Sequence, residues 1–164
     1  MLSLTALLHT NNDALRLARC LETLYPCDHI LIVDHNSHDA TVQIAREYGA
    51  RLTAADSKTD AQDYAQSAAP GYILALDPRE SLTEGLAASL FELKLDWKRP
   101  RSTPDAPSAY SVFLREETIG GWIEHPTAHT RLVPHDWKHW NGGFPVPDNS
   151  AIALEGELLR FVFP

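Results

Sequence analysis

The sequence lacks the features that mark several large classes of protein. Its 164 residues include 14 lysines and arginines against 22 aspartates and glutamates, so the formal net charge is −8. Without a cluster of basic residues the chain cannot neutralise a phosphate backbone, and we expect no nucleic-acid partner. No apolar run is long enough to span a membrane. A Gly-x-Gly-x-x-Gly motif after the first predicted strand and a Walker loop are both missing, which argues against a dinucleotide-binding Rossmann enzyme and a P-loop enzyme.

Cysteine is also scarce. Cys20 and Cys27 have neither metal-binding nor redox spacing, which favours two reduced thiols in a reducing compartment. A polar run from His9 to Asp13 interrupts the apolar start, so the N-terminus does not resemble a signal peptide. These features predict a cytoplasmic protein, and the length is that of one globular domain.

Two short apolar runs are each followed directly by a carboxylate. Ile30–Val33 precedes Asp34, and residues 72–76 precede Asp77. Such runs are typical of buried parallel strands. Ligands bind at the carboxyl edge of open α/β sheets, where helix N-termini favour anions, so both aspartates are candidate ligand-binding residues. The alternative for residues 34–39 is a well-capped strand-to-helix turn without a ligand.

The order of predicted elements indicates an α/β fold. Strands are predicted near residues 2–8, 30–33, 50–53, 72–76, 110–114 and 157–163. Helices are predicted near residues 14–24, 41–48, 61–69 and 82–93. Asn11 or Asn12 is expected to cap the first helix, and Ser81 to form a capping box with Glu84 before the last. Strand–helix alternation implies a parallel sheet with right-handed crossovers.

The segment after the second strand resembles a motif of inverting glycosyltransferases of family 2, of the lipopolysaccharide-core type. That motif reads Val-Asp-Ser-Gly-Ser-Thr-Asp-Gly-Thr. Five positions of this chain match it: Val33, Asp34, Ser37, Asp39 and Thr41. The resemblance implies a GT-A fold, which is a Rossmann-like, mostly parallel sheet flanked by helices. It also implies transfer of a sugar from a UDP-type nucleotide-sugar donor to an acceptor hydroxyl in glycan or cell-envelope synthesis.

The resemblance implies roles for individual parts of the chain. The nucleoside and donor would be contacted by Asn11, Asp34, Ser37, Asp39, Asp77 and Arg79. Asp148, or less favourably Glu124, would be the general base. A single domain over 1–164 would comprise a nucleotide-binding half (1–97), a proline-rich loop (98–109) and a truncated acceptor-side half (110–164). The acceptor is unidentified; a glycan or a lipid-linked molecule would fit.

The chain departs from the family pattern at the residues that would bind the metal ion. The family's metal motif reads Leu-Asp-Ala-Asp-Glu, whereas here the second acid is Arg79 between Asp77 and Glu80. Mg²⁺ or Mn²⁺ needs oxygen ligands, so Asp77 is the remaining candidate metal ligand and Arg79 opposes an ion. Arg79 is expected either to pair with Asp77 or Glu80, or to contact a diphosphate itself. The alternative function is a catalytically degenerate homologue that serves as a nucleotide-binding or protein-interaction module.

Histidine and tryptophan form the remaining candidate sites. His125 and His129, and likewise His135 and His139, are four residues apart, but nearby prolines disfavour a helical zinc site. We therefore expect structural or surface histidines. Three tryptophans are expected either to stack on an acceptor sugar or to belong to the core: Trp122, Trp137 and Trp140.

Overall fold

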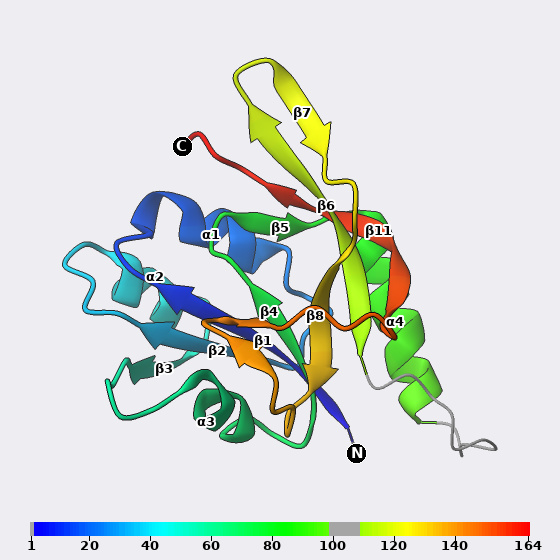
Figure 1. Cartoon of the computed structure of the whole chain (residues 1–164). Coiled ribbons are helices and arrows are strands. Elements are labelled where there is room, and N and C mark those ends of the chain that lie inside the picture. Colours follow the sequence, from blue (N-terminus) through cyan, green and yellow to red (C-terminus); the bar gives the residue numbers. More distant parts are fainter. Residues whose placement is uncertain (1, 99–108) are drawn as a thin grey trace.

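The computed structural model describes residues 2–98 and 109–164, so residues 99–108 of the expected proline-rich loop lie outside the described residues. The described chain forms a large curled sheet with helices on both faces (Figure 1). Its strands follow the order β3-β2-β1-β4-β8-β6-β11-β5, and β7 pairs with β6. This α/β arrangement confirms the predicted fold class.

The N-terminal half of the sheet is parallel. It consists of β1 (Ser3–Thr10), β2 (His29–Asp34), β3 (Arg51–Ala54) and β4 (Gly71–Leu76). Every residue of β4 is buried, as expected for a strand covered on both faces. In register, Thr10 lies opposite Asp34 and Leu8 opposite Leu76. The three strands β1, β2 and β4 therefore end at nearly the same level.

The C-terminal half of the sheet is mixed. It consists of β8 (His129–Pro134), β6 (Tyr110–Thr118), β11 (Ile152–Arg160), β5 (Glu80–Leu82) and β7 (Gly121–Glu124). A separate two-stranded hairpin is formed by β9 (Trp140–Asn141) and β10 (Phe144–Pro145). Figure 1 shows the β6–β7 hairpin projecting from the body of the sheet, with the C-terminal tail beside it.

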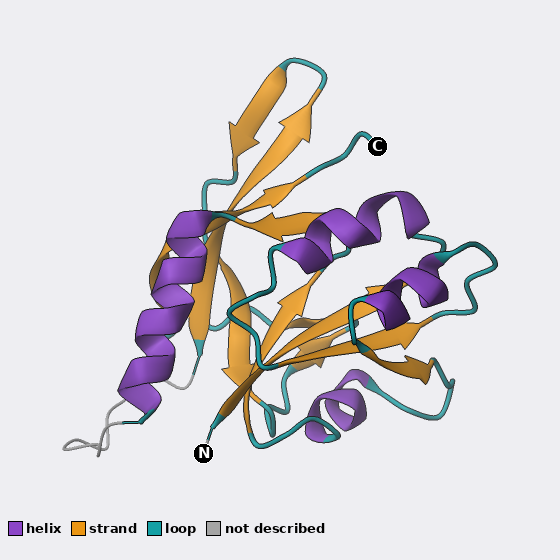
Figure 2. Cartoon of the chain, turned by 180° about the vertical axis from the view of Figure 1, so that it is seen from behind, coloured by secondary structure: helices purple, strands orange, loops and turns teal. Residues whose placement is uncertain are grey.

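Helices cover the two faces of the sheet unequally. The helices are α1 (Ala14–Glu22), α2 (Thr41–Glu47), α3 (Ala61–Gln66) and α4 (Glu84–Trp97). Leu4, Ala6 and Leu8 of β1 pack with residues of α1, α2 and α4, whereas Leu7 packs with Tyr64 of α3. This division follows from the alternation of side chains along a strand. In Figure 2, α4 lies along the C-terminal half of the sheet, and the other helices flank the N-terminal half.

The first helix is capped differently from the prediction. Its N-cap is Asp13, not Asn11 or Asn12, and the Asp13 side chain makes no capping bond. Instead the N–H of Asp13 donates to Thr41 Oγ1 at 2.8 Å, and the N–H of Ala14 donates to Asp39 Oδ2 at 3.2 Å. Side chains from the second strand-to-helix segment thus satisfy the orphan donors of α1. Local sequence alone could not indicate partners more than 20 positions away.

The predicted capping box at Ser81 is wrong. Ser81 belongs to β5, where it lies opposite Leu159 of β11. The N-cap of α4 is Thr83, whose Oγ1 accepts from the N–H of Leu86 at 3.3 Å. Because Ser81 and Leu82 pair with β11, the N-cap of the helix is two residues later than predicted, at Thr83.

Strand β11 contains a bulge that brings it close to α4. Its register against β6 shifts between Ala153 and Glu157. Within this interval Gly156 has a φ of +94°, and a Cβ built there would lie only 2.2 Å from the backbone nitrogen of Leu86. Only glycine fits both the conformation and the space.

Two sequence expectations concern thiols and membranes. Cys20 is buried, Cys27 is partly buried, and both are free. Burial raises the pKa of the Cys27 thiol to about 12, which favours the neutral, unreactive form. In the described segments, we find no helix with both the length and the apolar character needed to span a membrane.

Candidate functional site

The candidate site lies at the carboxyl edge of the parallel strands. From β1 the chain passes to β2 and β3 on one side, then returns to add β4 on the other side of β1. This reversal is a topological switch point, where open α/β sheets leave a crevice for ligands. Thr10 is the last residue of β1, Asn11 follows it, and Asp77 follows β4 at the same edge of the sheet.

Asp34 is held by three hydrogen bonds. Its Oδ1 accepts from Thr10 Oγ1 at 2.7 Å and from Ser37 Oγ at 2.6 Å, and its Oδ2 accepts from the N–H of Ser37 at 3.0 Å. Burial alone would raise the pKa of Asp34, but the bonds from Ser37 and Thr10 outweigh burial and lower it. The carboxylate is therefore kept ionised while it joins β1 to β2.

The loops after β1 and β2 are bound to each other. The N–H of Asn12 donates to Ser37 Oγ at 2.9 Å, and the N–H of His38 donates to Asn12 Oδ1 at 2.8 Å. Asn12 and Asn36 have φ values of 53° and 57°, a left-handed conformation that asparagine adopts more readily than most residues. Ser37 and Asp39, two predicted nucleoside contacts, are thus held by backbone and side-chain bonds in a closed network.

His9 and Asn11 extend this network toward the centre of the sheet. Asn11 Nδ2 donates to the carbonyl of His35. The Nδ1 of His9 lies 2.9 Å from the Nε2 of His35, so one ring donates to the other. Burial, with a smaller contribution from His35, lowers the pKa of His9 to about 4. His9 is consequently neutral near pH 7.

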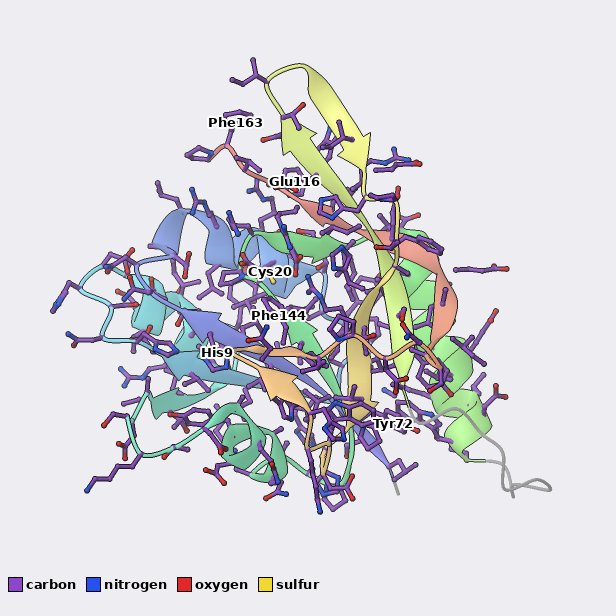
Figure 3. The ribbon with its side chains drawn as sticks, in the orientation of Figure 1. His9, Cys20, Tyr72, Glu116, Phe144 and Phe163 are labelled. Carbon is purple, nitrogen blue, oxygen red and sulfur yellow. The ribbon has the colours of Figure 1, made fainter. Side chains whose placement is uncertain are left out.

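The β9–β10 hairpin covers the end of β1. A Cβ added to Gly143 would lie 2.9 Å from the Cδ2 atom of His9, so the hairpin backbone rests on the imidazole ring. The guanidinium of Arg131 lies 4.2 Å from the ring centre of Phe144. Figure 3 shows Phe144 and His9 near each other at the centre of the molecule. The hairpin therefore covers the end of β1 on the side of the sheet where α3 lies.

Both carboxylate oxygens of Asp77 accept hydrogen bonds from Arg79. Arg79 Nε donates to Asp77 Oδ1 at 2.9 Å and Arg79 Nη2 donates to Oδ2 at 3.2 Å, while the Arg79 N–H also donates to Oδ1 at 2.9 Å. Burial would raise the pKa of Asp77, but the bonds from Arg79 outweigh it and lower the pKa. The expected pairing of Arg79 with Asp77 is confirmed.

Glu80 is the anchor of a buried ionic cluster. It has no exposed surface, and both of its oxygens accept from the guanidinium of Arg131, at 2.7 and 2.9 Å. Arg160 Nη2 donates to Oε2 at 3.0 Å, and the N–H of Asp77 donates to Oε1 at 2.8 Å. Full pairing is what allows ionised groups to remain buried. Glu80 therefore has a structural role, because both of its oxygens are bonded to other parts of the protein.

The divalent ion that the resemblance implies does not fit these residues. Both oxygens of Asp77 are bound by a guanidinium, and Glu80 is enclosed by two more. A cation would also meet the positive charge of Arg79. Across residues 2–98 and 109–164, no group of three or more His, Cys, Asp or Glu side chains is placed to hold a metal. Asp77 is thus poorly suited to be a metal ligand.

The two candidate bases lie on different parts of the sheet. Asp148 follows the β9–β10 hairpin, and its N–H donates to Thr130 Oγ1 at 2.9 Å. Hydrogen bonds from the hydroxyl and N–H of Ser150 lower the pKa of Asp148. Glu124 lies on β7 and accepts from Arg115 at 2.7 Å. Among the described residues, no hydrogen bond or ion pair connects either acid to Asp77.

The histidine pair at 125 and 129 is a structural contact. Nδ1 of His125 lies 3.0 Å from Nε2 of His129, and Nε2 of His125 lies 2.8 Å from Glu116. The His125 ring therefore connects Glu116 of β6 with His129 of β8. His135 is bonded by the N–H of Gly71 at 3.4 Å.

The tryptophans have two environments. Trp137 and Trp140 pack on the core beside Tyr64 and also line a cavity of about 1020 Å³ with Asp148. Trp122, on the projecting hairpin, contacts Phe161 edge-to-face with ring centres 5.2 Å apart. The core packing expected for tryptophan is confirmed for Trp137 and Trp140. Stacking on an acceptor sugar stays a prediction, and Trp122 belongs to neither the core nor this cavity.

Sequence reasoning missed the arginines that pair with Glu80. Arg131 and Arg160 are central to the site, yet neither is near Glu80 in the sequence. Arg131 belongs to an Arg-Leu-Val segment that resembles an Arg-Leu-Phe element of family 2 glycosyltransferases, a signal that could have singled it out. Arg160 has no comparable signal.

Replacing Asp34 by asparagine should destabilise the fold at neutral pH by roughly 1.5–3 kcal/mol, the range for hydrogen bonds to a charged group. Because the pKa of Asp34 is lowered in the folded state, its contribution is present above the unfolded pKa of about 3.9 and is lost as pH falls through the folded pKa. Urea unfolding at pH 7 and pH 3 measures the difference. Asp136→Asn, at an exposed position, is the control. An equal deficit at both pH values would contradict the assignment.

A curated protein resembles part of this chain in sequence. No family model matches the sequence. A TPR repeat-containing protein of Synechococcus elongatus is 35% identical over 120 residues, which cover 70% of this chain and 27% of that protein. The chain thus spans little more than a quarter of the length of this curated relative.

Solved structures show the fold. Mannosyl-3-phosphoglycerate synthase from Rubrobacter xylanophilus aligns with a TM-score of 0.50 and 18% identity, over 71% of this chain and 40% of that chain. A mycobacterial protein aligns with a TM-score of 0.50 and 14% identity, over 71% and 42%. Glucosyl-3-phosphoglycerate synthase from Mycobacterium tuberculosis, solved with Mn²⁺ and UDP, aligns with a TM-score of 0.43 and 12% identity, over 70% and 43%. The alignment with mannosyl-3-phosphoglycerate synthase shows that the chain has the fold of the GT-A glycosyltransferases.

Proposed function

We propose that this chain binds a UDP-type nucleotide sugar in the crevice between β1 and β4, as the donor-binding part of a glycosyltransferase. One observation carries the proposal: three polar residues that match the family motif, Asp34, Ser37 and Asp39, lie in the segment that follows β2 at the switch point of the sheet. Thr10 binds Asp34 from the end of β1, and the Asp77–Arg79 pair follows β4 at the same edge. The acceptor would be a hydroxyl of a glycan or a lipid-linked molecule in cell-envelope synthesis.

The reaction assigns a task to each group. Asn11, Asp34, Ser37 and Asp39 would orient the nucleoside. The acceptor hydroxyl attacks the anomeric carbon, the bond to the diphosphate breaks, and positive groups must offset the charge that develops on the leaving diphosphate. Asp148 is the proposed base that takes the hydroxyl proton. Its carboxylate is ionised near pH 7, as a general base requires.

The second candidate function is a degenerate homologue that binds a nucleotide, or a protein partner, without turnover. The closed Asp77–Arg79 pair favours it, because the acid that matches the metal motif has no free oxygen. The two candidates share the fold and differ in whether UDP is released from a UDP-sugar.

A thermal-shift screen of UDP-, GDP- and CDP-sugars tests the proposal. A ligand at 100 times its dissociation constant stabilises by about 2.7 kcal/mol, which corresponds to a rise in Tm of about 5–11 °C for a domain of this size. We expect that rise with UDP-sugars. No shift with any nucleotide would refute donor binding and leave the protein-interaction module. A shift without UDP release in a coupled assay would favour the degenerate homologue.

A further inference from the structure

The strongest disagreement between the family pattern and the structure lies at residue 79. The family places an aspartate there, and two aspartates hold the divalent ion against the diphosphate of the donor. In this chain Arg79 occupies the position and forms a forked, two-bond pair with Asp77.

The Asp77–Arg79 pair has the same net charge as the family's two aspartates with their divalent ion. Two carboxylates and a divalent cation carry a net charge of zero. Asp77 and Arg79 also carry a net charge of zero, because replacing an aspartate by an arginine adds two positive charges. The substitution therefore supplies the same total charge that the ion would bring. A site that had simply lost its ion by a neutral substitution would keep an uncompensated acid.

The geometry leaves Arg79 able to contact a ligand. A guanidinium has five N–H donors in a planar fork that matches phosphate oxygens. Arg79 uses Nε and Nη2 for Asp77, and its Nη1 has no hydrogen-bond partner among the residues the structure describes. The side chain is 36% exposed, whereas that of Arg131 is 4% exposed. Arg79 is thus far more accessible than Arg131 and is held in place by Asp77.

The neighbouring acids cannot restore a metal site. Glu80 is enclosed by Arg131, Arg160 and the N–H of Asp77. Glu116 is bonded to His125 at 2.8 Å and lies 3.8 Å from Arg160. Glu80 and Glu116 therefore already have cationic or donor partners.

We propose that Arg79 takes the place of the divalent ion, so that this edge binds a nucleoside diphosphate without metal and with the Arg79 guanidinium on a phosphate oxygen. The inference rests on the proposed donor site and specifies how that site recognises the phosphates. Asp77 is then a positioning residue, which fixes the direction of the guanidinium and does not touch an ion.

Calorimetric titration with UDP, in EDTA and in MnCl₂, tests the inference. The wild type should bind UDP with the same affinity in both buffers. Arg79→Gln should bind about 10- to 100-fold more weakly in both, the loss expected for a charge-assisted hydrogen bond. Arg46→Gln, which removes an exposed arginine at the end of α2, is the matched control and should bind like the wild type. Arg79→Asp should bind weakly in EDTA and recover in MnCl₂.

The outcomes separate this inference from the proposed function. If UDP binding by the wild type rises tenfold or more with Mn²⁺, the inference is wrong and the donor site stands. If Arg79→Gln keeps wild-type affinity while its thermal unfolding is unchanged, the inference is also wrong. If neither the wild type nor Arg46→Gln binds UDP in either buffer, the proposed function fails and the inference fails with it.

Discussion

Replacing Arg131 by methionine should lower the free energy of unfolding by about 3–5 kcal/mol, the cost of removing one partner from a buried ion pair. For a chain of this length, that loss corresponds to a fall in Tm of about 6–20 °C. The reason is the position of Glu80, which has no exposed surface and receives both arms of the Arg131 guanidinium. Methionine fills much of the space but leaves the carboxylate short of two donors.

Two further variants show whether the loss comes from an unpaired charge. Arg160→Met should cost less, because Glu80 keeps the fork from Arg131 and Arg160 is less buried. The double variant Arg131→Met/Glu80→Leu should recover part of the loss, since it removes both charges. Recovery should be incomplete, because the N–H of Asp77 then loses its acceptor. Urea unfolding followed by circular dichroism at pH 7 gives the free energies. If the free energy of unfolding of Arg131→Met lies within about 1 kcal/mol of the wild-type value, the Arg131–Glu80 pair contributes less than expected for a buried ion pair.

Replacing Gly156 by alanine should also be strongly destabilising, by about 2–5 kcal/mol. Part of the cost is conformational, because φ at this position is +94°. The larger part is steric, because the new Cβ would lie 2.2 Å from the nitrogen of Leu86 and 2.6 Å from its Cα. These are backbone atoms in the first turn of α4, so the helix itself would have to shift.

Gly142→Ala is a matched control for the conformational part. Gly142 has a φ of +60°, and a Cβ built there has no neighbour within 4 Å. This variant should lose only about 1–2 kcal/mol, the cost of a left-handed conformation. Thermal unfolding of the two variants side by side isolates the contact between β11 and α4. Equal losses would mean that the close approach at Gly156 relaxes at no cost.

The strands of the parallel half were predictable from local sequence, whereas in the mixed half the prediction found only β6 and part of β11. The apolar runs before Asp34 and Asp77 are short, uninterrupted and followed by polar turns, so periodicity and length agree on buried strands. By contrast, β5 lies where Ser81 and Glu84 suggest only a helix cap. Its strand conformation depends on pairing with β11, which is remote in the sequence. Tertiary pairing therefore decided what local preference left open.

The candidate site shows the same division. The place of Asp34 and Asp77 at the sheet edge follows from strand ends and could be predicted. The hydrogen-bond partners of the two carboxylates could not be predicted, because they depend on which donors the fold brings close to them. Thr10 meets Asp34 through strand register, and Arg131 meets Glu80 across β8 and β5. Such contacts between distant segments have no signature in a single sequence.

The position of β1 between β2 and β4 has a consequence for the kinetics of folding. Ser3 pairs with Gly71, so the second side of β1 stays open until a chain segment far along the sequence arrives. Pairings between such distant strands form slowly, and an open strand edge during synthesis is exposed to incorrect partners. Pairing with β2 involves a much shorter loop and can come first. The crevice between β1 and β4 is thus completed only by the slow, long-range step of folding.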